Sequence, residues 1–190
     1  GYGRGSRGRA DRAHPAARTA ITRNGPSAPV KELHRRGLIQ GKVLDFGAGK
    51  GEDARWLRSQ GFKVTAYDPH HGPHKIPAGT FDTVLSTYVL NVIPKAEQDR
   101  AVTAIRGKLA PGGTALVTVR RDVCNGERAG AVQSCVKRPW PEVVSGSGFT
   151  TYKLGGARGR ASRGRSNEEE DAPRVLYHLT NRARFKLDPR

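Results

Sequence analysis

The sequence predicts an α/β protein built on a doubly wound, mostly parallel sheet. Between residues 41 and 120, segments with the pattern of strands alternate with segments with the pattern of helices, as in sheets whose parallel strands are joined by helices. A length of 190 residues suits one such domain. Residues 140–144 predict the start of a last helix, and residues 149–154 and 175–180 predict an antiparallel C-terminal hairpin.

The first predicted unit is a strand, a glycine-rich turn and a helix. The apolar strand 43–46 runs directly into three alternate glycines, and the helix 52–60 that follows ends at Gly61. Glycine allows a sharp turn and a close approach of the backbone to a ligand, because it has no Cβ atom. The unit therefore has the form of a nucleotide-binding turn, with these glycines: Gly47, Gly49 and Gly51.

A second predicted strand, residues 62–67, ends in Asp68. An acid at this place can accept hydrogen bonds from both hydroxyls of a ribose. Glu52 and Asp53 put two negative charges into the first turn of the preceding helix. They would repel a diphosphate, whereas a cationic sulfonium that carries an ammonium group suits them. The unit therefore predicts a site for a positively charged nucleoside.

The alternation continues in the next segments. Residues 81–94 have the pattern of a buried strand followed by a loop, and residues 98–109 carry apolar residues at helical spacing. The Ala-Pro-Gly-Gly segment at 110–113 ends that helix, and residues 114–119 form a further strand.

This order of motifs resembles the class I, Rossmann-like methyltransferases that depend on S-adenosylmethionine. The resemblance covers residues 41–120 and implies S-adenosylmethionine as the cofactor, with Asp45 orienting the glycine turn and the methionine ammonium and Asp68 holding the ribose. A narrower resemblance, from residues 19–33, 67–69 and 88–93, is to methyltransferases found with bacterial DNA phosphorothioation systems and in phages. The cofactor-binding residues that the resemblance implies are Asp45, Gly47, Gly49, Gly51, Asp68, Ser86, Tyr88 and Asn91.

The sequence departs from that family between the second strand and the Phe81 strand. Only residues 69–80 separate them, too few for a crossover helix and another strand, so the sheet is predicted to be abbreviated there. This connection contains His70, His71 and His74. Because they have no cysteine or carboxylate partners at ligand spacing, we expect loop residues and no metal site.

The charge predicts contact with nucleic acid. The formal net charge is +17 and the pI is about 10.8, so the surface attracts polyanions. Residues 1–18 are expected to form a disordered basic tail, and residues 19–190 a single domain with an Arg/Gly-rich loop at about 155–173. The alternative is that both Gly-Arg segments are merely solvated. The residues expected to contact the substrate or nucleic acid are Arg120, Arg121, Arg158 and Arg160.

The two cysteines, Cys124 and Cys135, leave three interpretations open. A catalytic thiolate for C5 methylation of a pyrimidine is one, a reduced structural or surface thiol is favoured, and a disulfide would need an oxidising compartment. No apolar run is long enough to span a bilayer, so we expect a soluble, cytoplasmic protein, with an organellar location left open.

Three functions follow from these observations. The first is methylation of nucleic acid at a nitrogen or oxygen atom, favoured by the charge. The second is methylation of a small molecule, favoured by the form of the loop at 89–92 and the turn at 111–113. The third is a non-catalytic nucleic-acid-binding or assembly protein that kept the fold. The oligomeric state and the catalytic residue are not predicted.

Overall fold

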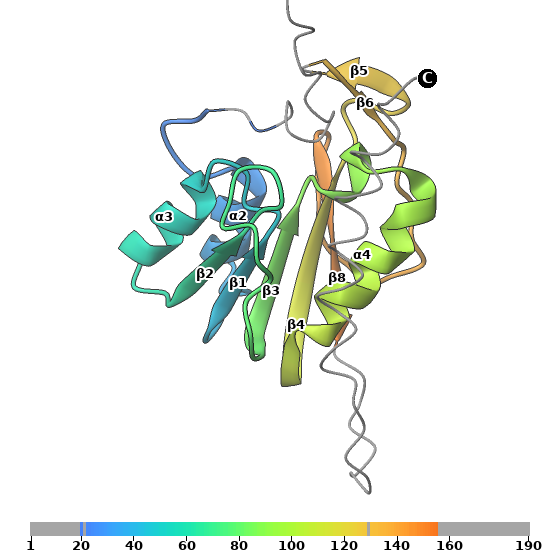
Figure 1. Ribbon diagram of the computed structural model, residues 1–190. Helices are drawn as coiled ribbons and strands as arrows, with labels where there is room; N and C mark the ends of the chain where they lie inside the picture. Colours follow the sequence, from blue (N-terminus) through green and yellow to red (C-terminus); the bar gives the residue numbers. More distant parts are fainter. Residues whose placement is uncertain (1–19, 21, 129, 156–190) are drawn as a thin grey trace, which may run out of the picture.

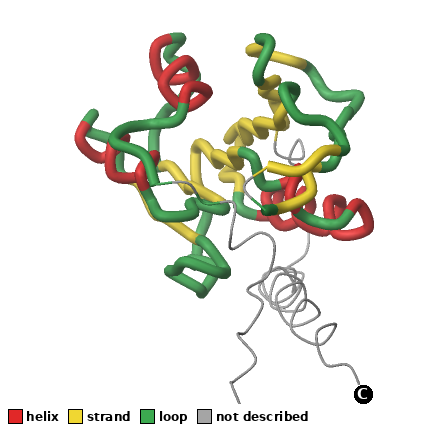
Figure 2. The backbone as a smooth tube through the Cα atoms, turned by 90° about the horizontal axis from the view of Figure 1, so that it is seen from above, coloured by secondary structure: helices red, strands yellow, loops and turns green. Residues whose placement is uncertain are grey.

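The computed structural model describes residues 20, 22–128 and 130–155. Within these residues the chain forms one six-stranded sheet, a separate two-stranded hairpin and helices on both faces of the sheet (Figures 1 and 2). The elements in chain order are α2 Ala28–Arg35, β1 Val43–Phe46, α3 Glu52–Ser59, β2 Val64–Tyr67, β3 Phe81–Thr87, the 3-10 helix η1 Leu90–Val92, α4 Lys95–Gly107, β4 Leu109–Arg120, β5 Gly126–Arg128, β6 Ala131–Gln133, β7 Glu142–Ser145 and β8 Phe149–Gly155.

The strand order confirms the predicted doubly wound sheet. Its six strands follow the order β2-β1-β3-β4-β8-β7, in which β1 to β4 are parallel and β8 runs antiparallel to both of its neighbours. Residues 69–80 contain no helix or strand, as the abbreviated connection predicted. For this reason β2 forms one edge of the sheet.

The alternation of side chains along the strands creates two hydrophobic layers. Leu44 and Val84 pack with α4 on one face, while their neighbours Val43 and Leu85 pack with α2 and α3 on the other. Successive residues of a strand point to opposite faces, so a parallel strand that is covered on both sides is buried along its whole length. The four residues of β1 are accordingly all buried, including Asp45.

One prediction about the last elements needs correction. Residues 140–144 begin no helix: residues 142–145 form β7, and residues 149–155 form β8, which pairs with β4 as well as with β7. The β-branched pair Val143 and Val144, followed by two glycines within four residues, suits a short strand and a turn. The expected partner strand at 175–180 lies outside the described residues.

Candidate active site

The main cleft lies at the carboxyl ends of the parallel strands, where open α/β sheets bind their ligands. Its walls come from the glycine turn after β1, the segment after β2, the loop after β3, the end of β4 and the β5–β6 hairpin, which stands above the sheet in Figure 1. The walls surround about 1040 Å³ of empty space, which includes solvent at the open mouth of the cleft.

The glycine turn is shaped by two positive φ angles. Gly47 has φ +84° and Gly49 has φ +55°, and both line the cleft. A Cβ atom on Gly47 would collide with Cγ2 of Val89, and one on Gly49 would lie 3.2 Å from the Cβ of Ala20. The absence of side chains therefore keeps the floor of the cleft open. Gly51, with φ +82°, precedes the first residue of α3 and does not line this cleft.

Asp68 ties the end of β2 to the glycine turn. Its Oδ2 accepts a hydrogen bond from the backbone N–H of Gly49 at 2.8 Å, and its Oδ1 accepts from the backbone N–H groups of His70 and His71, also at 2.8 Å. Nδ1 of His71 lies 3.2 Å from the same Oδ1. Because a carboxylate offers about four acceptor positions, Oδ2 keeps room for one ribose hydroxyl.

Asp45 is a buried acid without a full set of partners. It is 2% exposed and lines the cleft, and its Oδ2 has no hydrogen-bond partner within the part of the chain that the structure describes. Burial, together with the nearby charges of Asp53 and Asp68, raises the pKa of Asp45 to about 8, against the opposing effect of Arg58 and Arg23. Such a group favours a cationic ligand, which would compensate its negative charge.

The segment before α2 forms one side of the cleft. Asp53, in the first turn of α3, holds this segment in place. One oxygen of Asp53 accepts from the backbone N–H of Ser27 at 2.5 Å, and the other accepts from the Ser27 hydroxyl at 2.9 Å. The same carboxylate lies 3.8 Å from the guanidinium of Arg23, which lines the cleft. Sequence reasoning assigned Asp53 only a general negative charge and missed both α2 and this contact.

The ends of β3 and β4 bring an aromatic ring and cations to the cleft. Tyr88, directly after β3, has φ +61°, and its N–H donates to the carbonyl of Thr118 at 2.9 Å. The guanidinium carbon of Arg120 lies over the Tyr88 ring, 4.4 Å from its centroid. Burial raises the pKa of Tyr88, so its phenol is protonated at neutral pH. Asp122 bridges Arg120 and Arg128 at 2.9 and 3.0 Å, and both arginines line the cleft.

Three other predicted site residues lie away from the cleft surface. Ser86 is fully buried within β3. Asn91 is also fully buried: its Oδ1 accepts from the N–H of Arg120, and its Nδ2 donates to the carbonyl of Ser134. Arg121 donates to the carbonyl of Val136, the hydroxyl of Tyr152 and the hydroxyl of Thr150. The predicted contacts Arg158 and Arg160 lie outside the described residues.

The cysteines form a disulfide, which corrects the favoured prediction of a reduced thiol. Cys124 precedes β5 and Cys135 follows β6, so the bond closes the base of the hairpin. In this state neither sulfur is a nucleophile. The sequence left the disulfide open as an alternative, because it could not show that the intervening residues fold back as a hairpin.

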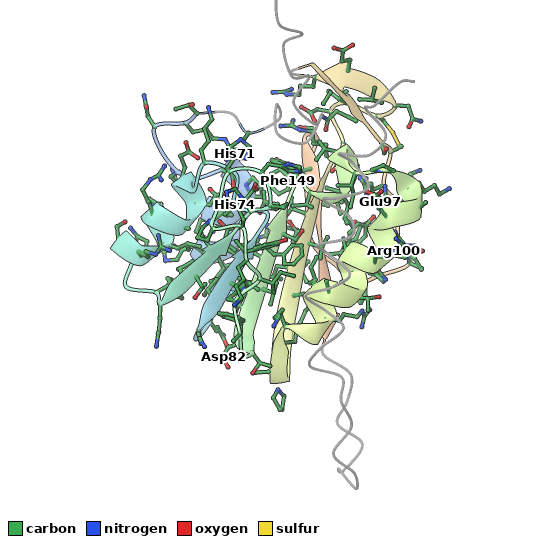
Figure 3. All side chains as sticks on the ribbon, in the orientation of Figure 1. His71, His74, Asp82, Glu97, Arg100 and Phe149 are labelled. Carbon is green, nitrogen blue, oxygen red and sulfur yellow. A yellow bond between two sulfur atoms is a disulfide. The ribbon has the colours of Figure 1, made fainter. Side chains whose placement is uncertain are left out.

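In the part of the chain that the structure describes, the remaining histidines and acids do not assemble a metal site. His71 lies in the upper part of the molecule, His74 lies below it, and Asp82 lies at the lower end (Figure 3). Among the described residues, no group of three or more His, Cys, Asp or Glu side chains is arranged to hold a metal ion. Within the same residues, no helix has both the length and the apolar character needed to cross a membrane.

The residues present fit the cofactor that the resemblance implies. The side-chain-free turn at Gly47 and Gly49 provides backbone contact, and the unpartnered buried oxygen of Asp45 suits an ammonium or sulfonium charge. Asp68, with its remaining acceptor position, suits a ribose hydroxyl.

Comparisons with known proteins agree with this geometry. A family model described as a methyltransferase domain matches residues 10–151. A solved complex of DhpI with SAH has a TM-score of 0.51 at 22% identity, and the match covers 69% of this chain and 85% of that one. This likeness shows the fold. A comparison with curated proteins gives no match.

Two further solved structures are similar over different lengths. The 1,6-didemethyltoxoflavin-N1-methyltransferase of Burkholderia thailandensis, with its substrate and S-adenosylhomocysteine bound, has a TM-score of 0.49 at 18% identity, covering 76% of this chain and 79% of that one. A structure from echinomycin biosynthesis, concerned with conversion of a disulfide bond into a thioacetal group, has a TM-score of 0.45 at 27% identity over 52% of this chain. That match spans 53% of the other chain, about half of its length.

Proposed function

The chain belongs to the methyltransferase domain family, whose methyl donor is S-adenosylmethionine, and from this premise we propose that it methylates a nitrogen or oxygen atom of a nucleic acid. The observation that carries the choice of substrate is the Arg120–Tyr88 pair, which lines the cleft at the ends of β3 and β4. A guanidinium over an aromatic ring combines attraction for phosphate with a flat surface beside which a base can stack.

The residues at the ends of β1 and β2 would hold the cofactor. Asp45 would hold the methionine ammonium, the backbone at Gly47 and Gly49 would contact the methionine part, and Asp68 would accept from a ribose hydroxyl. When bound, S-adenosylmethionine supplies an electrophilic methyl group on its sulfonium. The protein's contribution is to align the acceptor and to exclude water from the cleft, which together can supply most of the acceleration of a displacement reaction.

The charge of the whole chain supports a polyanionic substrate. The net charge is +17, and lysine and arginine outnumber aspartate and glutamate in residues 20–155 as they do in the full sequence. Positive charge near a cleft raises the local concentration of polyanions and their association rate. The Gly-Arg segments at 1–9 and 155–165 would add to this attraction, although they lie almost wholly outside the described residues.

A small anionic metabolite is the second candidate substrate. Asp122 bridges Arg120 and Arg128 and so neutralises part of their charge. The cluster keeps a net positive charge near +1, which suits one phosphate or carboxylate as well as it suits a chain of phosphates. The β5–β6 hairpin, which stands above the sheet (Figure 1), also contributes Arg128 and Gln133 to the lining of the cleft.

Transfer of labelled methyl groups decides between these substrates. The intact chain is incubated with methyl-labelled S-adenosylmethionine and, separately, with single-stranded DNA, RNA and a mixture of small metabolites. We expect label in a polynucleotide, and in the same assay, at a cofactor concentration that does not saturate the variant, we expect far less label with Asp68→Ala, which has lost its hydrogen bond to the ribose. Label confined to small molecules would replace the proposed substrate with the second candidate. A chain that binds no S-adenosylmethionine at millimolar concentration would refute the methyl transfer itself.

A further inference from the structure

Gln133, at the end of β6, is a buried glutamine whose side-chain oxygen accepts no hydrogen bond from the described residues. It is 2% exposed and lines the main cleft. Its Nε2 lies 3.5 Å from the carbonyl of Ala131 and donates to it, which leaves Oε1 as the atom without a partner among the described residues. A buried acceptor without a donor costs about 1–3 kcal/mol, so this oxygen favours a ligand that brings an N–H or O–H group.

The residues around Gln133 hold it in place. The next residue, Ser134, donates its N–H to the carbonyl of Asn91 at 2.7 Å and accepts from Nδ2 of Asn91 at 2.8 Å. The N–H of Cys135 donates to Oδ1 of Asn125 at 3.2 Å, and the disulfide closes the base of the hairpin. Asn91 is fully buried in the loop behind β3. The hairpin is therefore fixed to the sheet immediately beside Gln133, as a binding residue requires.

The side chains that line the cleft around Gln133 supply no free base. They are the phenol of Tyr88, which is protonated at neutral pH, and the guanidinium groups of Arg120 and Arg128, with which the carboxylate of Asp122 is paired. The acids that line the cleft, and His70, belong to β1, α3 and the segment at the end of β2. A hydroxyl acceptor has to lose its proton as it is methylated, which needs a base close by. An amine can be methylated through its lone pair and lose a proton afterwards, so these side chains favour nitrogen.

We infer that the acceptor is an exocyclic amino group of a nucleobase, one N–H of which donates a hydrogen bond to Oε1 of Gln133. This inference rests on the proposed function and narrows it to one kind of atom. The phosphate of the same nucleotide lies at Arg120 and Arg128. The nitrogen lone pair forms the new N–C bond while the C–S bond breaks with its electron pair left on sulfur. The methylated nitrogen then gives its extra proton to water, which balances the step.

Pairs of nucleotides that differ only in this group test the inference by binding. Adenosine and inosine 5′-monophosphate differ by an amino group in place of a carbonyl, and so do cytidine and uridine 5′-monophosphate. With S-adenosylhomocysteine present, calorimetry on the intact chain should show at least one amino nucleotide bound roughly 5- to 100-fold more tightly than its carbonyl partner, because a carbonyl would face Oε1 without a hydrogen. Equal affinities in both pairs, or no nucleotide binding at millimolar concentration, would overturn the inference.

Variants of Gln133 locate the preference. Gln133→Leu should reduce the ratio of the affinities for the amino and the carbonyl nucleotide of the preferred pair to about one. Gln133→Glu keeps an acceptor oxygen and should keep the preference for the amino nucleotide. Gln98 provides the matched control, since it is a buried glutamine away from the cleft lining. Its Nε2 donates a hydrogen bond to the carbonyl of Leu90, and its Oε1 accepts one from Arg138. Gln98→Leu should leave the ratio unchanged. A preference that survives Gln133→Leu would also overturn the inference.

The binding assay and the methyl-transfer assay fail independently. Label in a polynucleotide together with equal binding of amino and carbonyl nucleotides would keep the proposed function and refute the role of Gln133. A clear preference for the amino nucleotides with label only in small metabolites would keep the role of Gln133 and move the substrate from polynucleotide to free nucleotide.

Discussion

The backbone N–H of Gly49 donates a hydrogen bond to Oδ2 of Asp68 at 2.8 Å, across the ends of two neighbouring parallel strands. The contact joins the turn that follows β1 to the acid that follows β2. Because the two halves of the cofactor site share this bond, a change in one half also alters the other. The same bond limits Asp68 to one further acceptor position on Oδ2.

Replacing Asp68 with alanine should weaken binding of S-adenosylmethionine by on the order of 2–4 kcal/mol, because charge-assisted hydrogen bonds to the ribose and to Gly49 are lost together. Calorimetry measures the affinity. Asp82→Ala is the control, since this acid accepts from the N–H of Lys42 at the far end of the molecule (Figure 3) and should leave the affinity unchanged. Equal affinities of wild type and Asp68→Ala would contradict the role of Asp68.

The buried Asp45 should make cofactor affinity depend on pH. Its pKa is raised to about 8 by burial, so at pH 7 most of the free protein carries a neutral Asp45. A cationic ligand favours the carboxylate, and affinity for S-adenosylmethionine should therefore rise between about pH 6 and pH 7.5, below the pH at which an α-amino group loses its own proton. Asp45→Asn should bind more weakly at about pH 7.5 and lose this rise. A wild-type affinity that stays constant over the same range would argue against contact between Asp45 and the cation.

The same shift predicts the opposite trend for stability without cofactor. The pKa of Asp45 is about 8 when folded, against about 4 for an unperturbed aspartate in the unfolded chain. Between these two values the folded protein binds more protons than the unfolded chain, so the free energy of unfolding falls as pH rises from 4 to 8. Urea unfolding at pH 5 and pH 8 measures the fall, and Asp45→Asn should reduce it. An identical pH dependence in the two proteins would place the titrating group elsewhere.

Gly47→Ala should destabilise the protein more than Gly61→Ala, although both glycines have similar positive φ angles of +84° and +92°. The left-handed backbone costs alanine about 1 kcal/mol at either place. Only at Gly47 does the new Cβ atom meet another side chain, Val89, which adds roughly 1–3 kcal/mol. Chemical unfolding of both variants gives the comparison, and equal losses would mean that the Val89 loop moves aside freely.

Much of the cofactor half of the site could be predicted from sequence, because its features are local. Gly47, Gly49 and Asp68 follow directly after strands whose apolar pattern is strong, and the structure brings all three to one cleft. Which residues at the end of β3 face the cleft is harder to predict. Ser86 and Tyr88 are two residues apart, yet Ser86 stays inside the sheet while the positive φ of Tyr88 turns it out of the strand. No propensity marks a tyrosine for that conformation.

The part of the site that would bind the methyl acceptor could not be predicted from the sequence, because its contacts join residues that are far apart in the chain. Asn91 connects η1 to Ser134 and to the end of β4, and Gln133 reaches the cleft only because the β5–β6 hairpin folds over it. The three-residue strands of that hairpin carry too weak a pattern to be recognised. The disulfide between Cys124 and Cys135 depends on the same fold.

Arg120 and Arg121 are neighbours with opposite expected behaviour. Arg120 lines the cleft over Tyr88, while Arg121 is held inside the protein by Val136, Tyr152 and Thr150. Arg120→Gln should weaken binding of a fluorescent single-stranded oligonucleotide and lower the slope of log affinity against log salt by about 0.7, the loss of one phosphate contact. Arg121→Gln should leave that slope unchanged and cost about 1–3 kcal/mol of unfolding free energy, because buried acceptors lose their donor.

The hydrogen bonds of Arg121 predict this difference between the two variants, although the sequence analysis expected both arginines to contact the substrate. If both variants lower the salt slope equally, Arg121 also contacts phosphate; if neither does, the positive charge of the cleft wall has no part in binding the polynucleotide.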